Sequence, residues 1–157
     1  MITARRATAI DVDELVRLRG VMQAALHGEE SAPGPWQAEA AAVLQRQLDA
    51  GDATLAAFVV ERPDEPGRLA ACAVGVIDQR LGSPANPAGR TGYVFSVSTD
   101  EGYRRRGYAR ACMEGVLGWY REQGIRKVDL RASVDAEPLY RSLGFARTPD
   151  PSMRLTM

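Results

Sequence analysis

Histidine and cysteine are scarce in this sequence, which leaves few candidates for nucleophilic or histidine-based catalysis. The only histidine, His27, lies at an expected helix end beside Gly28, where a cap or a surface residue is more common than a catalytic base. The two cysteines, Cys72 and Cys112, lie within apolar segments and lack metal-type spacing. We therefore expect both cysteines to be reduced core residues and the protein to use no metal.

The sequence also lacks net charge and long apolar runs. Its 20 basic and 20 acidic residues cancel, so no overall field attracts the protein to nucleic acid or to a membrane surface. No apolar run approaches the roughly 18 residues of a membrane span. The N-terminal residues also lack the apolar core of a secretory signal. These absences predict a cytoplasmic protein that binds neither nucleic acid nor membrane, and any anion site must be local.

Length and composition favour one folded unit. A chain of 157 residues that is 45% hydrophobic can bury about 70% of its unfolded surface in one core. No internal repeat, low-complexity segment or interdomain linker interrupts it. We expect a single domain over residues 1–157, present as a monomer or a homodimer.

Hydrophobic periodicity predicts strands and helices in alternation. Asp11 and Glu14 resemble a capping box at the start of the first helix, and Gly124 is a plausible C-cap of the third. The expected helices span 11–26, 36–48 (ending near Gly51), 107–123 and 136–143. The expected strands span 2–6, 54–62, 68–79, 91–99 and 125–133, followed by a last strand or two. This order predicts an α/β protein with a central mixed sheet.

Two segments rich in proline and glycine connect these elements. The sequence "PDEPG" between the second and third strands suggests a hairpin turn, and "LGSPANPAGR" at 81–90 is a loop. The third helix is expected to bury one face, formed by Ala109, Met113, Val116, Leu117 and Tyr120.

Four arginines crowd the start of the third helix, at Arg104, Arg105, Arg106 and Arg110. A helix N-terminus carries about half a positive charge, so each cation there is disfavoured by about 0.3–1 kcal/mol. A loop between a strand and a helix also points free backbone N–H groups at one spot, which favours phosphate. A bound phosphate would convert the repulsion into attraction, whereas a solvated turn is the simpler alternative.

The motif around Gly107 distinguishes between classes of phosphate ligand. Gly102 and Gly107 have P-loop spacing, but Tyr108 and Ala109 stand where that motif needs Lys and Ser or Thr, and no G-x-G-x-x-G follows a strand. What remains is R-x-x-G-x-A. Together with the helix, the strand and "LYRSLGF" that follow, residues from about Val94 to Phe145 resemble the GCN5-related N-acetyltransferases.

This resemblance implies a fold, a cofactor and a set of residues. The fold has six to seven strands flanked by about four helices, with the fourth and fifth strands splayed apart. The backbone amides from Arg105 to Arg110 would hold the pyrophosphate of acetyl-CoA, and Val97 and Thr99 would pair with the pantetheine arm. The N–H near Val97 would be the oxyanion donor, and Tyr140 would protonate the departing thiolate. The implied coenzyme-binding residues are Val97, Thr99, Arg104, Arg105, Arg106, Gly107, Tyr108, Ala109, Arg110 and, more weakly, Ser133.

The sequence departs from the family pattern at a few positions. Glu101 and Ser133 stand where the family often has proline and asparagine, and Ala109 replaces the commoner glycine. Only Ser133 changes the chemistry, because a hydroxyl replaces an amide. The strand at 91–99 contains no carboxylate, so the sequence assigns no general base. Three possibilities are Asp78, Glu29 and Glu30.

The resemblance implies transfer of an acetyl group from acetyl-CoA to a primary amine, by direct attack in a ternary complex. The acceptor, a small molecule or a peptide, would contact the linker between the first two helices and the loop at 81–90, which could act as a lid. An acyl-CoA sensor without catalysis is the alternative. Tyr140 could also simply pack its helix on the sheet, Trp36 could anchor a helix or line the acceptor pocket, and Glu29 and Glu30 could attract an amine or lie in solvent.

Overall fold

The structure is a computed structural model that describes residues 2–27, 34–50 and 53–157. Its five-stranded sheet has the spatial order β1–β2–β3–β4–β5. Neighbouring strands are antiparallel except β4 and β5, which are parallel, so the predicted mixed sheet is confirmed. The strands are β1 (Arg5–Arg6), β2 (Leu55–Glu61), β3 (Leu69–Gln79), β4 (Arg90–Thr99) and β5 (Val128–Leu130).

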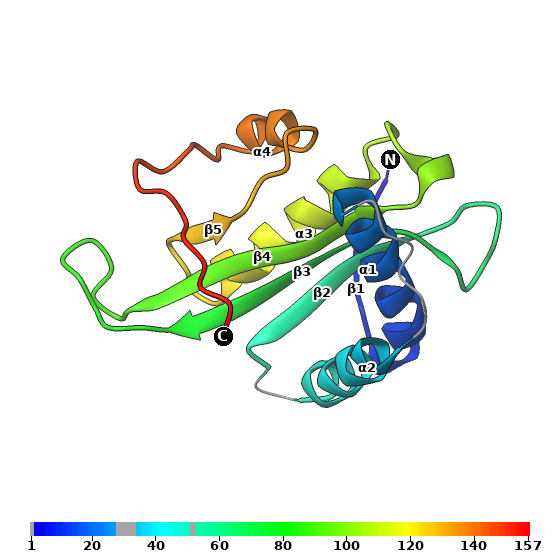
Figure 1. The fold of residues 1–157 in the computed structure, drawn as a ribbon, viewed down its shortest axis with the longest axis horizontal. Coiled ribbons are helices and arrows are strands. Elements are labelled where there is room, and N and C mark those ends of the chain that lie inside the picture. Colours follow the sequence, from blue (N-terminus) through cyan, green and yellow to red (C-terminus); the bar gives the residue numbers. More distant parts are fainter. Residues whose placement is uncertain (1, 28–33, 51–52) are drawn as a thin grey trace.

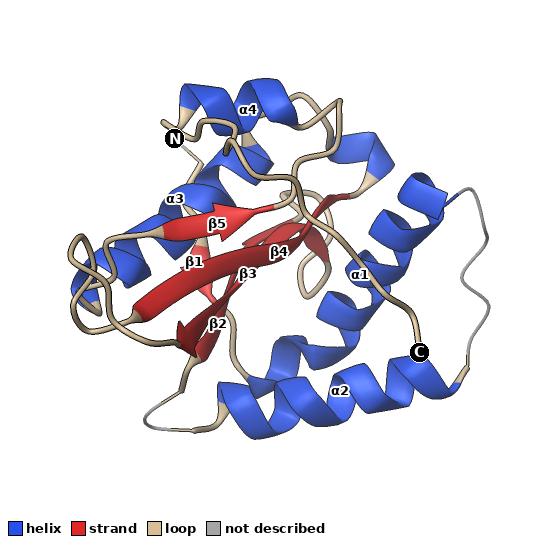
Figure 2. Ribbon diagram, turned by 60° about the vertical axis from the view of Figure 1, so that its left-hand side comes forward, coloured by secondary structure: helices blue, strands red, loops and turns tan. Residues whose placement is uncertain are grey.

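Helices cover both faces of this sheet. Figures 1 and 2 show α3 on one face and α1 with α2 on the other. None of the helices in the described ranges has both the length and the apolar character that a membrane crossing requires. The four helices are α1 (Val12–His27), α2 (Pro35–Leu48), α3 (Tyr108–Glu122) and α4 (Glu137–Ser142), and short 3₁₀ turns η1 (Ala9–Asp11) and η2 (Glu101–Tyr103) precede α1 and α3.

Two hydrophobic clusters lie on opposite faces of the sheet. One cluster joins α3 to β2, β3 and β4, and the other joins α1 to the opposite side of β2 and β3. Cys72 lies in the α1 cluster and Cys112 in the α3 cluster, and both are free thiols that are fully buried. Burial raises the pKa of Cys72 to about 12, so this thiol stays protonated and inert. The prediction of two reduced core cysteines is confirmed.

The helix α3 packs very closely on the sheet through Tyr120. Its ring lies against Gly75 and Gly92, and its hydroxyl donates to the carbonyls of Val76 and Tyr93 at 2.9 and 3.0 Å. Three residues of the expected apolar face are buried as predicted: Met113, Val116 and Tyr120.

The buried stripe of α3 is rotated from the expected one. Ala109 and Leu117 are only half-buried, whereas Cys112 and Trp119 are buried. The rotation brings Gly115 against Phe58 of β2, where a Cβ on Gly115 would lie 2.5 Å from the ring. A glycine is therefore what lets this side of the helix approach the sheet.

The end of the chain corrects the expected strand count. Residues 143–157 contain no strand, so the sheet of the described chain has five strands rather than six or seven. Pro149 and Pro151 each lack the N–H that a sheet ladder needs, and the segment they punctuate is largely exposed. It runs back past β5 as an irregular strap (Figure 1).

The predicted start of the first helix is also wrong in detail. The N–H of Thr8 donates to Asp11 at 2.9 Å, and Arg5 donates to both oxygens of Asp11. Asp11, the last residue of η1, therefore accepts the N–H of Thr8 at the start of that turn. The sequence instead suggested that Asp11 and Glu14 would form the capping pair. The predicted helix end near Gly51 lies outside the described residues; α2 has its C-cap at Asp49.

Gly115→Ala should destabilise the protein by about 1 kcal/mol or more, because the new methyl group collides with Phe58. Gly118→Ala on the same helix is the matched control: a Cβ there meets no atom within 4 Å, so the gain in helix propensity should stabilise by up to about 1 kcal/mol. Urea denaturation measures both changes. Equal shifts in the two variants would contradict the close packing.

Candidate functional site

A β-bulge distorts β4 near its C-terminal end. The pairing of Val74 with Phe95 is followed by the pairing of Cys72 with Ser98, so Ala73 of β3 faces two residues of β4. One of them, Ser96, has φ +51 and is 6% exposed. The extra residue reverses the alternation of side chains, so that Val94 and Val97 both pack on the α3 side.

The strands β4 and β5 separate just before this bulge. Their pairing begins at Gly92 with Val128 and ends at Val94 with Leu130, whereas β4 continues to Thr99. Within the described chain no strand pairs with residues 95–99 on that side. The predicted splay between β4 and β5 is therefore present.

Main-chain groups of Val97 and Thr99 face the open edge of β4. The next residue, Asp100, donates its N–H to Ala70 of β3 at 2.8 Å, so by alternation Thr99 and Val97 point away from β3. Consistent with this direction, Arg104 Nε donates to the carbonyl of Thr99 at 3.3 Å. The two predicted pantetheine-pairing residues thus lie where an extended ligand could reach their backbones.

The turn that follows β4 ends in a left-handed glycine. Gly107 has φ +83 and is the N-cap of α3, and Arg105 has the unusual φ of +61. Ala111 is the first residue of the helix whose N–H finds an acceptor, the carbonyl of Gly107 at 3.1 Å. For the N–H groups from Arg105 to Arg110, the described residues supply no acceptor. This row of free donors has the character of an anion cradle.

The side chains of the arginine cluster have few carboxylate partners. Arg106 lies over the ring of Tyr103, 5.2 Å from its centroid, and Arg105 forms no ion pair within the ranges that the structure describes. Arg110 has partners of its own, because it donates to Ser142 of α4 and lies 3.7 Å from Glu114. Tyr108 is buried and Ala109 half-buried, so these two offer the site their backbones.

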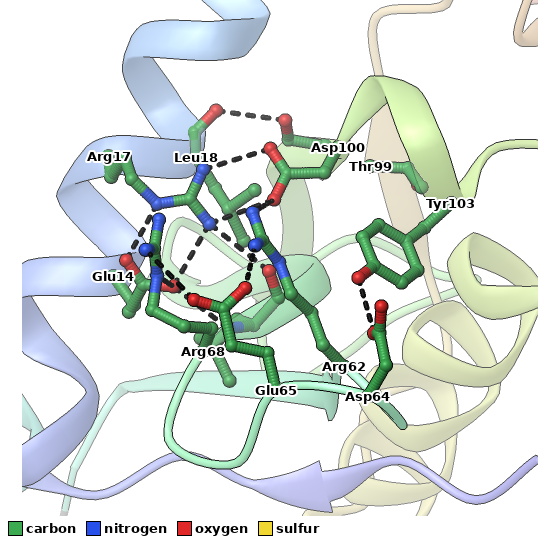
Figure 3. A network of polar contacts seen from close by, with 12 residues as sticks. Glu14, Arg17, Leu18, Arg62, Asp64, Glu65, Arg68, Thr99, Asp100 and Tyr103 are labelled. Atoms are coloured by element: carbon green, nitrogen blue, oxygen red, sulfur yellow. Dashed lines mark hydrogen bonds and ion pairs between the residues drawn. The ribbon is translucent and has the colours of Figure 1, made fainter.

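A network of charged side chains fixes the start of this turn, and sequence reasoning missed it. Asp100, 7% exposed, accepts two hydrogen bonds of 2.9 Å from Arg17 of α1 and one of 2.6 Å from Arg62 (Figure 3). Its carbonyl accepts from the N–H of Tyr103 at 2.9 Å. Asp100 therefore joins α1, the β2–β3 turn and the loop before α3.

Glu14 extends the network to the hairpin turn. It accepts hydrogen bonds from Arg17, Arg68 and the N–H of Leu69. Burial alone would raise the pKa of Glu14, but these donors outweigh it and lower the pKa to about 2. No local pattern could have found this network, since its members are far apart in sequence.

Tyr140 and Ser133 both lie at α4. Tyr140 is 6% exposed and packs edge-on to Phe145, and burial raises its pKa. Ser133 Oγ accepts from the N–H of Ala136 at 3.3 Å, in the turn that leads into the helix that carries Tyr140. Tyr140 also lines a cavity of about 400 Å³ between β5, α4 and the C-terminal strap, whose other walls include Asp129, Leu130, Glu137, Phe145 and Arg147.

Other candidates from the sequence lie away from this arrangement. His27 is exposed at the end of α1. Asp78 on β3 is 44% exposed and lies 3.7 Å from Arg80. Trp36 is half-buried near the start of α2, and Glu29 and Glu30 lie outside the described residues.

Comparison with known proteins decides the family. The sequence matches the profile described as the Acetyltransferase (GNAT) family over residues 19–145, most of the chain. The chain belongs to the GNAT acetyltransferase family. Its function class is therefore that of an acyltransferase, and the resemblance drawn from the R-x-x-G-x-A motif is confirmed.

Solved GNAT structures share the whole architecture. A predicted acetyltransferase from Clostridium acetobutylicum, determined with acetyl-CoA, is 24% identical with a TM-score of 0.81, covering 99% of this chain and 96% of its own. A GCN5-related N-acetyltransferase from Ralstonia eutropha is 22% identical with a TM-score of 0.81, covering 99% of each chain. Glucosamine-6-phosphate N-acetyltransferase from Arabidopsis thaliana is 18% identical with a TM-score of 0.76, covering 99% and 98%. No curated protein sequence is a significant match.

The Glu14 carboxylate should make the free energy of unfolding of this GNAT protein depend on pH in the acidic range. Its folded pKa of about 2 lies below its ordinary value of 4.5, so its contribution is full above about pH 4.5 and is lost as pH falls towards 2. Glu14→Gln should lower stability at pH 7 and flatten this part of the pH profile. Urea denaturation at pH 3, 5 and 7 measures both. A variant with the wild-type slope would contradict the role of Glu14.

Proposed function

We propose that this GNAT protein transfers the acetyl group of acetyl-CoA to a primary amine, by direct attack within a ternary complex. One observation carries the proposal: a row of free N–H groups at the start of α3 continues into the open edge of β4. A ligand that is a diphosphate at one end and an extended amide chain at the other fits both parts. Acetyl-CoA has that form and supplies an activated thioester.

The turn from Arg104 to Arg110 would hold the diphosphate. Its free N–H groups would point at the ligand, and Arg104, Arg105 and Arg106 add positive charge, since none of the three forms an ion pair within the described chain. Gly107 adds room for close approach, since a Cβ there would meet only Ile2 at 3.7 Å. Repulsion between these cations and the helix end is offset only when an anion is bound.

The open edge of β4 would bind the pantetheine arm. Val97 and Thr99 would pair with its amides as a neighbouring strand does, and the N–H near Val97 would donate to the thioester oxygen as negative charge develops there. Arg104, now on the carbonyl of Thr99, would turn towards the phosphates. Ser133 would act through the turn before α4, where its Oγ already accepts from the N–H of Ala136.

Tyr140 would be the proton donor to the leaving thiolate. A phenol near pKa 10 donating to a thiolate near 8.5 works against about 1.5 units, or roughly 2 kcal/mol, which is modest if donation accompanies cleavage of the C–S bond. Burial raises the pKa of Tyr140 above its ordinary value, so the phenol stays protonated at neutral pH and donation to the thiolate becomes more uphill than this figure. The proton transfer must therefore accompany cleavage of the C–S bond.

The acceptor side is defined more loosely. GNAT enzymes act on small molecules or peptides, and we propose an amine that contacts the loop 81–90; the other expected contact, the linker between α1 and α2, lies at 28–33 outside the described residues. This loop is internally bonded, with Ser83 and Asn86 exchanging two hydrogen bonds of 3.0 Å, so any closure would move it as one piece. We further propose that the whole chain is one GNAT domain acting in the cytoplasm.

Gly107→Ala should weaken coenzyme A binding at least tenfold, because an L-residue is strained at φ +83 and would displace the N–H groups of this turn. Gly124→Ala is the control, with a similar φ of +74 at the other end of α3 and open space around it. Both variants should lose about 1 kcal/mol of stability, but only the first should lose affinity in calorimetry. Equal affinities would contradict the assignment of the loop.

Tyr140→Phe should lower kcat at least tenfold and leave coenzyme A affinity unchanged, since only the hydroxyl is lost. The assay is thiol release from acetyl-CoA with a panel of amines, and calorimetry gives the affinity. An acyl-CoA sensor, the alternative function, would release no thiol with any amine while still binding the coenzyme. Full turnover by the variant would show that Tyr140 only packs α4 on the sheet.

A further inference from the structure

Asp129 of β5 is a carboxylate that the sequence did not single out. Its neighbours on β5, Val128 and Leu130, pack against the cluster on the α3 side, so the side chain of Asp129 points to the opposite face. Its register partner on β4 is Tyr93. Tyr93 stacks with Phe95, which packs on the cluster of α1. Asp129 therefore faces the side of the sheet that α1 and α2 cover.

The carboxylate of Asp129 lacks the partners that other shielded carboxylates have. Asp11, Glu14 and Asp100 are each held by at least one arginine, and Glu137, in the same cavity as Asp129, is held by Arg141 and Arg147. Asp129 is half-buried, and although its backbone pairs with β4, its carboxylate forms no hydrogen bond or ion pair with any residue in the described ranges. The same cavity wall contains Arg131, Arg141 and Arg147, of which Arg141 and Arg147 bind Glu137 and none forms an ion pair with Asp129 in the described chain. The half-buried carboxylate of Asp129 is therefore open to a cationic ligand.

Asp129 also lies beside the point where β4 and β5 part. The last pair of the ladder, Val94 with Leu130, is one residue further along, and the first unpaired position of β4, Phe95, is two residues away. At about 3.3 Å per residue, Phe95 is roughly 7 Å from the pair that contains Asp129. The cavity of about 400 Å³ that Asp129 lines has Tyr140 in its wall as well.

We propose that Asp129 receives the ammonium group of the acceptor and takes its proton. This rests on the function proposed above. At pH 7 only about one alkylamine in 2,500 is neutral and able to attack the thioester. A base at the amine site therefore has a large effect on the rate of acetyl transfer. Asp129 takes one proton from the ammonium and releases it to solvent. The amine nitrogen then bonds to the acetyl carbon and passes its second proton to the free Asp129 carboxylate, while the C–S bond breaks and Tyr140 protonates the sulfur.

The test compares Asp129→Asn with the wild type on two kinds of nucleophile. The cationic probe is whichever of phenylalanine, spermidine, glucosamine 6-phosphate, kanamycin and a lysine peptide gives the fastest thiol release. The neutral probe is hydroxylamine, which is largely unprotonated at pH 7. The variant should lose at least a hundredfold in kcat/KM for the cationic amine and only a few-fold for hydroxylamine. Asp129→Glu should restore part of the loss.

Asp78→Asn is the matched control. Asp78 is a carboxylate on the same face of the sheet, but it lies 3.7 Å from Arg80 and does not line the cavity that contains Asp129, so this variant should keep near wild-type rates. Calorimetry should give the same coenzyme A affinity for all variants. A wild type that uses the amine, together with an Asp129→Asn variant that keeps more than a tenth of its kcat/KM, would overturn the inference. A wild type that acetylates none of the probes would instead overturn the proposed function.

Discussion

The start of α3 holds a concentration of positive charge that the protein does not neutralise. Free N–H groups from Arg105 to Arg110 coincide with three arginines that have no carboxylate partner in the described chain. Such a place is unfavourable without an anion, because the helix dipole and the guanidinium groups repel each other. The fold keeps this turn in place through Asp100, whose carboxylate is held by arginines from α1 and from the β2–β3 turn. Binding a diphosphate relieves the repulsion, and this relief underlies the proposed coenzyme site.

The second constraint is the separation of β4 and β5. A parallel pair that ends after Val94 leaves the backbone of β4 unpaired, and the bulge at Ser96 turns this free edge towards the start of α3. Main-chain groups that a complete sheet would consume thereby become a binding surface. Beside this separation, Asp129 and Tyr140 line the same cavity. Asp129 is proposed to act on the amine, and Tyr140 is proposed to protonate the thiolate.

Local features of the site could be predicted from the sequence, and features that depend on distant contacts could not. The turn with Gly107, the helix after it and the strand before it follow from spacing and residue type within about 30 residues. The Asp100 network joins α1, the β2–β3 turn and β4, so no local pattern reveals it. The sequence did not single out Asp129, because its position in the site depends on its pairing with Tyr93 of β4. The C-terminal strands were expected from the family pattern, but Pro149 and Pro151 remove donors there, and the segment forms a strap instead.

The central claim is that a diphosphate accepts hydrogen bonds from the backbone at the start of α3. The most direct measurement is a ¹H–¹⁵N NMR titration of the protein with coenzyme A. The account predicts that the amide protons from Arg105 to Arg110 move downfield together as they acquire acceptors. Binding that leaves these amides unchanged, or saturating coenzyme A that perturbs no resonance at all, would contradict it.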